Sequence, residues 1–105
     1  MDIGVWDAWG KKVGEVTSLG VVLDSSGSKV GDVTPRGTIS DRYDRKIGDV
    51  SPRGTISNGF DRKVGDVSPR GTVSDMYDRK VGDVTGTSDI FLMGGAALLL
   101  LLDRD

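Results

Sequence analysis

Hydrophobic and polar residues alternate in a short sequence motif, here called the phrase, that recurs along most of the chain. Lysine, a β-branched apolar residue, glycine, an acidic residue and valine occur in that order five times, seventeen residues apart, at residues 12–16, 29–33, 46–50, 63–67 and 80–84. Seventeen residues are too few for a pair of helices and match one β-hairpin with its turns. The pattern therefore predicts an array of about five hairpins.

Two kinds of turn separate the predicted strands. Pro-Arg-Gly occurs at residues 35–37, 52–54 and 69–71, where proline fixes φ at the first corner and glycine tolerates a positive φ. The other turn is Asp-x-Tyr-Asp-Arg, which becomes Asn-Gly-Phe-Asp-Arg at residues 58–62. The short segments between these turns are rich in β-branched residues, as strands are.

The spacing of the valines predicts an irregularity in every second strand. Val30 and Val33 are three residues apart, so in a regular strand they would face opposite sides of the sheet. A β-bulge at Gly31 would insert one extra residue and turn both valines inward, leaving Lys29 and Asp32 on the other face. Because the glycine recurs in each copy of the phrase, we expect a bulge at each of these glycines.

The predicted inward-facing residues form a small aliphatic lining. The set comprises Val5, Val13, Val16, Val22, Val30, Val33, Ile39, Ile47, Val50, Ile56, Val64, Val67, Val73, Val81 and Val84. A sheet lined only by valine and isoleucine needs another apolar layer against it. Residues 96–102 are apolar at every position, and a helix that is hydrophobic all round is buried inside a protein.

These elements together predict the fold. Ten strands about 4.8 Å apart and tilted by about 40° close at a radius of roughly 10 Å, which leaves room for one helix. We therefore expect an all-β repeat protein whose 17-residue hairpins form a closed or nearly closed barrel or flower around a hydrophobic C-terminal helix. The single domain spans residues 1–105, with hairpins at 4–84, a crossover at 85–94, and a buried apolar helix with a charged end at 95–105.

Composition narrows the chemistry. Fourteen basic and sixteen acidic residues give a net charge of −2, which provides no electrostatic reason to expect binding to nucleic acid or to an anionic membrane. The chain has no cysteine and no histidine, so it lacks thiol chemistry and the commonest general base and metal ligand. We expect no enzymatic activity and no cofactor.

Two segments bear on localisation. Residues 1–7 lack the basic start and apolar run of a Sec-type signal peptide. The apolar run at residues 90–102 is thirteen residues long, whereas a membrane-spanning helix needs about twenty, so a buried helix is favoured over a membrane anchor. The cellular compartment is left open.

The repeat resembles that of a known group of proteins. Val-x-Asp-x-x-Gly-x-x-Val-Gly, at residues 5–14 and 22–31, and the run from Gly94-Gly95-Ala96-Ala97 into polyleucine resemble bacterial β-flower-like small repeat proteins. The resemblance implies hairpins arranged radially around a central axis and no established activity; the named form has four hairpins. Residues 43–48 also resemble the Tyr-Asp-x-x-Gly motif of YD-type repeats of bacterial surface proteins, but they contain one residue more.

Charged residues at repeated positions give two candidate sites. The acids Glu15, Asp32, Asp49, Asp66 and Asp83 could form a ring of oxygen ligands for Ca²⁺, but a lysine flanks each one, so we expect ion pairs on an outer face instead. Arg36, Arg53 and Arg70 occupy identical turns at one rim and could bind an anionic group, although solvated turn residues are the simpler interpretation.

Aromatic residues at one repeat position give the candidate recognition surface. Trp9, Tyr43, Phe60 and Tyr77 are predicted near the opposite rim, with Trp6 nearby. They could stack on sugars or bury in a partner, since aromatic residues are enriched at interfaces. The favoured interpretation is that they cover the barrel end and shield the central helix.

The function predicted from the sequence is a non-enzymatic structural or interaction module whose partner, protein or glycan, is unknown. The alternatives are binding of a glycan or cell-envelope polymer through the rim aromatic residues, and membrane association through an exposed segment 90–102. We expect no nucleic-acid partner and disfavour a membrane partner, while homo-oligomer formation is left open.

Overall fold

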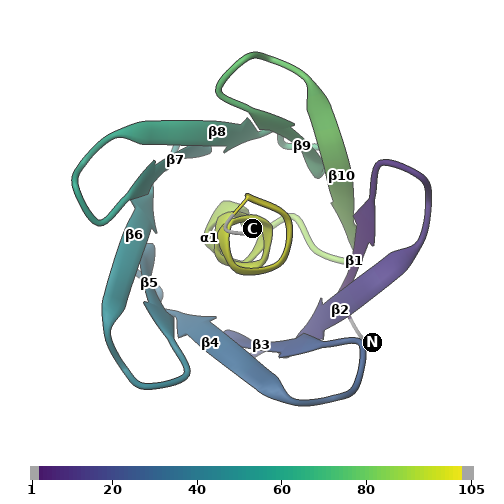
Figure 1. The fold of residues 1–105 in the computed structure, drawn as a ribbon, viewed down its shortest axis with the longest axis horizontal. Coiled ribbons are helices and arrows are strands. Elements are labelled where there is room, and N and C mark those ends of the chain that lie inside the picture. Colours follow the sequence, from purple (N-terminus) through teal and green to yellow (C-terminus); the bar gives the residue numbers. More distant parts are fainter. Residues whose placement is uncertain (1–2, 103–105) are drawn as a thin grey trace.

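The computed structural model describes residues 3–102, which form ten strands followed by one helical segment. The strands are β1 (Ile3–Asp7), β2 (Lys12–Val16), β3 (Val21–Asp24), β4 (Lys29–Val33), β5 (Thr38–Asp41), β6 (Lys46–Val50), β7 (Thr55–Asn58), β8 (Lys63–Val67), β9 (Thr72–Asp75) and β10 (Lys80–Thr85). Each strand pairs with its neighbours in sequence, and β1 pairs antiparallel with β10, so the sheet closes into a barrel (Figure 1). The predicted fold class is confirmed.

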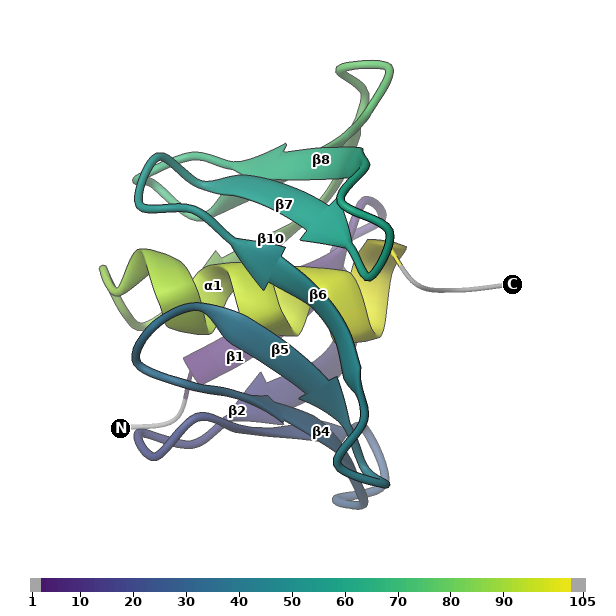
Figure 2. The ribbon, with the colours of Figure 1, turned by 90° about the vertical axis from the view of Figure 1, so that its left-hand side faces the viewer.

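The five hairpins are β1–β2, β3–β4, β5–β6, β7–β8 and β9–β10, and their loops flare outward around the axis (Figure 1). We call these loops the hairpin tips: residues 8–11, 25–28, 42–45, 59–62 and 76–79. The helical segment, α1 (Ile90–Ala96) continued by a π-helix, η1 (Ala97–Leu102), runs along the barrel axis (Figure 2). The tips therefore surround the end of the barrel at which η1 finishes.

Pro-Arg-Gly turns join successive hairpins at the other end, which we call the turn end. In the first of these turns, Gly37 has φ of +90°, and a Cβ there would meet the carbonyl oxygen of Val50. The hydroxyl of Thr34 accepts hydrogen bonds from the backbone N–H groups of Arg36 and Thr38. Glycine is thus required by both the backbone conformation and the close approach of the next strand.

A β-bulge occurs in every repeat, but its position differs from the prediction. Ser40 lies opposite Lys46 and Ile39 lies opposite Gly48, so Ile47 is the extra residue. The same register shift leaves Val13, Val30, Val64 and Val81 as the extra residues elsewhere. The bulge therefore lies one residue before the glycine. It places the glycine and the following valine, two residues apart, on the inner face.

The predicted inward set is correspondingly wrong for five residues. Val13, Val30, Ile47, Val64 and Val81 are only half-buried beside the core, whereas the other predicted residues are buried. Lysine and the acid of each phrase share the outer side, as expected, and form ion pairs there. The prediction missed the repeat glycines, which face inward, and Ile3, which is a buried core residue.

The five repeat glycines face the five leucines of η1. A Cβ at each glycine would lie 2.5–2.9 Å from a leucine Cδ atom and closer still to a backbone carbonyl oxygen, which cannot move aside as a side chain can. The pairs are Gly48 with Leu98, Gly31 with Leu99, Gly14 with Leu100, Gly82 with Leu101 and Gly65 with Leu102. Each successive leucine thus meets the next hairpin around the barrel.

The π-helix explains this one-to-one match. An α-helix has 3.6 residues per turn and rotates by roughly 100° per residue, which is more than the fifth of a circle that separates neighbouring hairpins. A π-helix, with hydrogen bonds from residue i to i+5, is wider and rotates less at each residue. The wider helix therefore directs five consecutive leucines to five consecutive hairpins.

The complementary arrangement occurs nearer the turn end, where large residues come from the barrel and small ones from the helix. The buried ring of Val16, Val33, Val50, Val67 and Val84 surrounds the axis there. A Cβ at Gly95 would lie 2.5 Å from Val33 Cβ, and one at Gly94 would meet Val50. Only a helix with minimal side chains fits within this ring, which explains Gly94-Gly95-Ala96-Ala97.

The helix begins earlier than predicted. Asp89 caps it, because its carboxylate accepts hydrogen bonds from the backbone N–H groups of Phe91 and Leu92. The segment that crosses into the barrel is therefore residues 86–89, shorter than the predicted 85–94, and the charged end at 103–105 lies outside the described residues. Within residues 3–102, no helix is long and apolar enough to cross a membrane.

Candidate recognition surface at the hairpin tips

The predicted aromatic residues lie on the tips of equivalent hairpins. The side chains of Trp9, Tyr43, Phe60 and Tyr77 are 89%, 66%, 85% and 71% exposed, respectively. Ser26 holds the same repeat position in the second hairpin. Because the tips flare away from the axis and the aromatic side chains are mostly in solvent, the prediction that they shield the central helix is wrong. We call these five positions the tip surface.

An aspartate or asparagine at the end of the first strand of each hairpin fixes the tip. The Oδ1 atom of Asp41 accepts hydrogen bonds from the backbone N–H groups of Tyr43 at 2.8 Å and Arg45 at 3.1 Å. Asp44 occupies the left-handed region, with φ of 69°, which aspartate tolerates better than most residues. Asn58 makes the corresponding bonds to Phe60 and Arg62. The aromatic side chains therefore project from defined turns.

The same hydrogen bonds perturb the acidity of the aspartates. The backbone N–H of Arg45 lowers the pKa of the Asp41 carboxyl below its ordinary value, with smaller contributions from Tyr43 N–H and the Arg45 charge. The backbone N–H of Arg79 lowers the pKa of Asp75 in the same way. Hydrogen bonds to the ionised form favour that form, so these turns are most stable when the carboxylates are charged.

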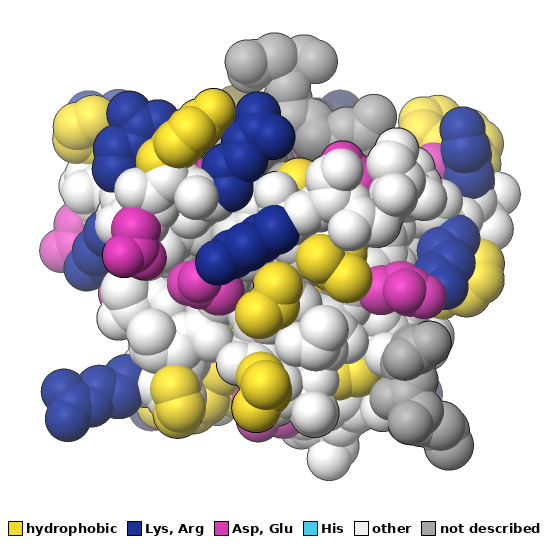
Figure 3. Space-filling view, turned by 90° about the horizontal axis from the view of Figure 1, so that it is seen from below, with side chains coloured by type: hydrophobic (Ala, Val, Ile, Leu, Met, Phe, Trp, Pro, Cys, Tyr) yellow, Lys and Arg dark blue, Asp and Glu magenta, His cyan; other side chains and the backbone are white. Residues whose placement is uncertain are grey.

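Arginine side chains lie against two of the tip rings. The guanidinium carbon of Arg45 lies 5.4 Å from the centre of the Tyr43 ring, and that of Arg79 lies 5.4 Å from the Tyr77 ring. Each of these arginines also forms an ion pair with its turn aspartate, Asp41 or Asp75. The guanidinium carbon of Arg42 also lies 5.4 Å from the Tyr43 ring, so the surface combines aromatic faces with basic side chains, two of which are ion-paired. Figure 3 shows Lys and Arg side chains beside hydrophobic ones near the upper end of the molecule.

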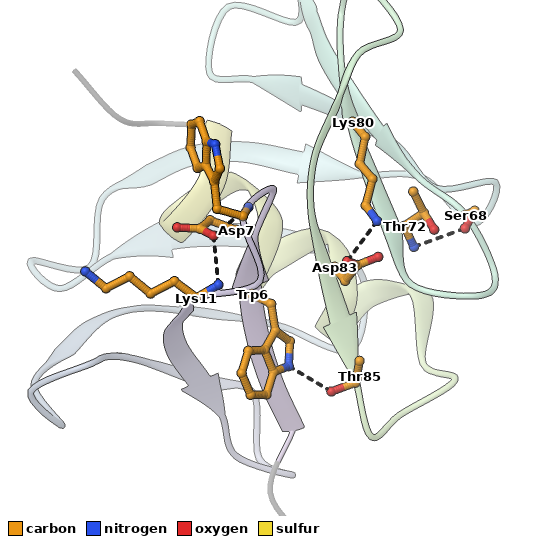
Figure 4. A network of polar contacts seen from close by, with 9 residues as sticks. Trp6, Asp7, Lys11, Ser68, Thr72, Lys80, Asp83 and Thr85 are labelled. Atoms are coloured by element: carbon orange, nitrogen blue, oxygen red, sulfur yellow. Dashed lines mark hydrogen bonds and ion pairs between the residues drawn. The ribbon is translucent and has the colours of Figure 1, made fainter.

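Trp6 does not belong to the tip surface. It lies on β1, is half-buried, and its indole N–H donates a hydrogen bond of 3.1 Å to the hydroxyl of Thr85 on β10 (Figure 4). This bond joins the first and last strands, where the barrel closes. The structure therefore places Trp6 at the seam and separates it from the other predicted aromatic residues.

The repeated acids form ion pairs with the repeated lysines, as expected. The Lys–acid distances are 2.7 Å for Glu15, 3.2 Å for Asp32, 3.1 Å for Asp49, 2.9 Å for Asp66 and 3.1 Å for Asp83. Figure 4 shows the Lys80–Asp83 pair on the outside of β10. Within residues 3–102, no cluster of three or more acidic side chains is placed to hold a metal ion.

The three turn arginines form no part of the tip surface. Arg36, Arg53 and Arg70 are exposed in the Pro-Arg-Gly turns at the opposite end of the barrel. Nothing in the geometry connects them with the aromatic residues. They provide a natural comparison surface when the tips are tested.

The structure also brings together residues that sequence reasoning did not single out. A hollow of about 400 Å³ between the first and fifth hairpins is lined by Asp7, Ala8, Trp9, Asp75, Arg79, Lys80, Val81 and Leu101. We call it the Trp9 hollow. Its residues come from both ends of the chain and from η1, so no local motif could have indicated them. Only closure of the barrel makes them neighbours.

The fold and the tips define a class of protein: a closed barrel of five sequence-repeat hairpins around an internal helix, with aromatic residues displayed on one end. No protein-family model, curated protein or solved structure matches this chain. Its function must therefore be inferred from its own residues.

Proposed function

We propose that this protein is a non-enzymatic interaction module that engages its partner with the tip surface. The observation that carries the proposal is the exposure of Trp9, Tyr43, Phe60 and Tyr77, which are 66–89% exposed at equivalent tips around one end. Exposing a large aromatic side chain to water is unfavourable, and such side chains are enriched in the cores of interfaces. Nothing in the packing of the barrel requires them, since Ser26 occupies the same position in the second hairpin.

The rigidity of the tips supports a binding role. Each aromatic residue follows an aspartate or asparagine that holds the turn through two backbone hydrogen bonds. A surface that is already ordered loses little conformational entropy on association. The radial arrangement of the hairpins also supports a relationship to β-flower-like repeat proteins, which we include in the proposal.

Burial of the apolar segment supports an interaction module over the membrane-anchor alternative. Met93, Leu98, Leu100 and Leu101 are buried within the barrel, and none of residues 90–102 is among the strongly exposed hydrophobic residues. Of the partners predicted from the sequence, a protein and a glycan both fit exposed aromatic residues. The hollow beside Trp9 favours the glycan, as argued below.

A variant with four serines tests the proposed surface. Trp9→Ser, Tyr43→Ser, Phe60→Ser and Tyr77→Ser together copy the natural state of the second hairpin, so the fold should be retained and the melting temperature should change little. Both proteins are applied to an array of purified oligosaccharides and polysaccharides, and light scattering measures self-association. Binding or self-association that disappears in the variant supports the proposal.

The turn end supplies the control. Arg36→Ser, Arg53→Ser and Arg70→Ser should leave tip binding unchanged. Loss of binding in the arginine variant, with binding retained in the four-serine variant, would contradict the proposal and move the interface to the turn end. Wild-type protein that stays monomeric and binds no array member also counts against it.

A further inference from the structure

The Trp9 hollow has the dimensions and lining of a small-molecule site. Its volume of about 400 Å³ lies within the range of about 300–1,000 Å³ that is typical of such sites. The first hairpin contributes one wall with Trp9 and Ala8, the fifth contributes another with Arg79, Lys80 and Val81, and Leu101 of η1 adds an apolar side chain. Aromatic, apolar and hydrogen-bonding groups therefore converge on one space.

The charges of the hollow are largely satisfied within the protein. Arg79 pairs with Asp75 at 3.2 Å, and Lys80 pairs with Asp83 at 3.1 Å. The two cationic side chains that line the hollow are thus neutralised by neighbouring carboxylates, which weakens attraction for an anion. The lining holds two carboxylates, Asp7 and Asp75, and two cations, so it carries no net charge that would attract a cation either. This combination favours a ligand that is neutral and hydrogen-bonding.

The turn of the first hairpin holds the Trp9 backbone in a defined position beside the hollow. The carboxylate of Asp7 accepts hydrogen bonds of 2.9 Å from the backbone N–H groups of both Trp9 and Lys11. Figure 4 shows the bond to Lys11 at the end of β1. The tip that carries Trp9 is therefore held by Asp7, while the indole itself is 89% exposed and available for contact.

We propose that the Trp9 hollow binds a neutral saccharide, one face of a pyranose ring stacking on the indole. The C–H groups on that face carry partial positive charge and are attracted to the negative face of an aromatic ring. Asp7 accepts a hydrogen bond from a ring hydroxyl and Arg79 donates one. This inference rests on the proposed function and names both the partner class and the tip that binds it.

The neighbouring hairpins provide an internal comparison. By the repeat, the space between the first and second hairpins is equivalent to the Trp9 hollow, and it contains two adjoining hollows of about 320 and 480 Å³. Val13 and Leu100 line one of them, in the places of Val81 and Leu101. Ser26 lines the other at the repeat position of Trp9. The space thus has a similar apolar lining but no aromatic wall.

Titration with cellotetraose and chitotetraose, two neutral β-1,4-linked tetrasaccharides, tests the assignment. In the ¹H–¹⁵N spectrum of the full chain, the Trp9 indole resonance is expected to shift with one site per chain. The Trp6 indole, bonded to Thr85, should stay in place as an internal reference. Trp9→Ala is expected to weaken binding by about tenfold or more.

Two further variants make the test specific. Leu19→Ala removes an apolar side chain that is 88% exposed, in the turn between β2 and β3, outside both the tip surface and the hollow, so binding should be unchanged. Ser26→Trp supplies the missing aromatic wall, so we expect a second binding site. Calorimetric titration should then give two sites per chain in place of one.

Three outcomes would overturn the saccharide site. In the first, neither tetrasaccharide moves the Trp9 resonance at about 10 mM, a concentration that detects even millimolar affinity. In the second, choline moves that resonance and the sugars do not, which indicates a cation site. In the third, Trp9→Ala binds the sugars as well as wild type while the four-serine variant does not; the tip surface then survives as an interface and only the hollow is wrong.

Discussion

The lumen and the tips of the barrel contain the same five-fold repeat, but they differ in what each repeated position contacts. In the lumen, every repeat glycine faces one leucine of η1, and a Cβ at any of them would lie within 2.9 Å of a leucine Cδ atom. At the tips, the repeated aromatic positions are mostly in solvent, and Ser26 replaces the ring in one hairpin. Packing therefore constrains substitution at the repeat glycines, whereas the exposed aromatic positions are under no such packing constraint.

The difference between the packed lumen and the exposed tips shows how a repeated sequence can specify a single structure. Five near-identical hairpins could pair in several registers, but only one arrangement places five glycines around one turn of leucines. The lumen fixes the fold through steric fit, which close-packed interiors enforce strongly. The tips are then free to diverge, as Trp9, Ser26, Tyr43, Phe60 and Tyr77 do.

The largest effect on stability is expected from Leu98→Ala. Leu98 is 4% exposed and faces Gly48, so truncation leaves a cavity that the barrel cannot fill. We expect a loss of about 3 kcal/mol in the free energy of unfolding. Chemical denaturation measures this loss; a change below about 1 kcal/mol would show that the leucines of η1 are not tightly packed.

A somewhat smaller loss, about 2 kcal/mol, is expected for Gly48→Ala, because the new Cβ meets both the Leu98 side chain and the carbonyl oxygen of Ser57. Gly59→Ala at a hairpin tip is the matched control, since its Cβ would have 3.6 Å to the nearest atom. Equal destabilisation by the two substitutions would contradict the prediction that packing is tight in the lumen and loose at the tips.

A double-mutant cycle checks the pairing of individual residues. Gly48→Ala should cost about 1 kcal/mol less in a Leu98→Ala background, because the side chain that it meets is gone. In a Leu101→Ala background the cost should be unchanged, since Leu101 faces Gly82. Coupling to both leucines alike would contradict the one-to-one match.

A moderate, pH-dependent effect is expected at the tips. The lowered pKa values of Asp41 and Asp75 mean that their stabilisation is complete above about pH 4 and is lost as the pH falls through the lower folded values. Asp41→Asn with Asp75→Asn retains the turn acceptor, as Asn58 does naturally, without titrating. The melting temperature of wild type should therefore fall more between pH 7 and pH 3 than that of the variant.

Equal losses of melting temperature in the two proteins would mean that the turn carboxylates do not stabilise the folded state. Other acids of the chain are common to both proteins, so their contribution cancels in the comparison. The measurement isolates the two aspartates whose pKa is lowered.

The smallest effect on stability is expected from Phe60→Ser. The ring is 85% exposed, and surface substitutions away from special features usually change stability by less than about 0.5 kcal/mol. A loss above about 1 kcal/mol would show that the tip aromatic residues support the barrel. Denaturation of this variant beside Leu98→Ala measures the two regions on one scale.

The sequence by itself determined the hairpins, their turns and the internal helix. The seventeen-residue spacing, Pro-Arg-Gly and the unbroken apolar run each have a local physical cause that needs no tertiary contact. The valine spacing predicted a bulge in each repeat on the premise that both valines face inward. The bulge is present, but the premise is wrong, because the first valine is itself the extra residue. Strict alternation from Val50 selects Gly48 for the inner face, whereas hydrophobicity selects Ile47, and the sequence alone does not say which criterion holds.

Only the tertiary structure decided which residues of these elements contact one another in the lumen and at the tips. Five identical leucines have no periodicity to read, so the π-helix and its match to the glycines follow from the width of the closed barrel. Likewise, Trp9 and Arg79 lie far apart in sequence and share a hollow only because β1 pairs with β10. Short-range patterns specify each hairpin, whereas contacts across the closed barrel exist only once all five are in place.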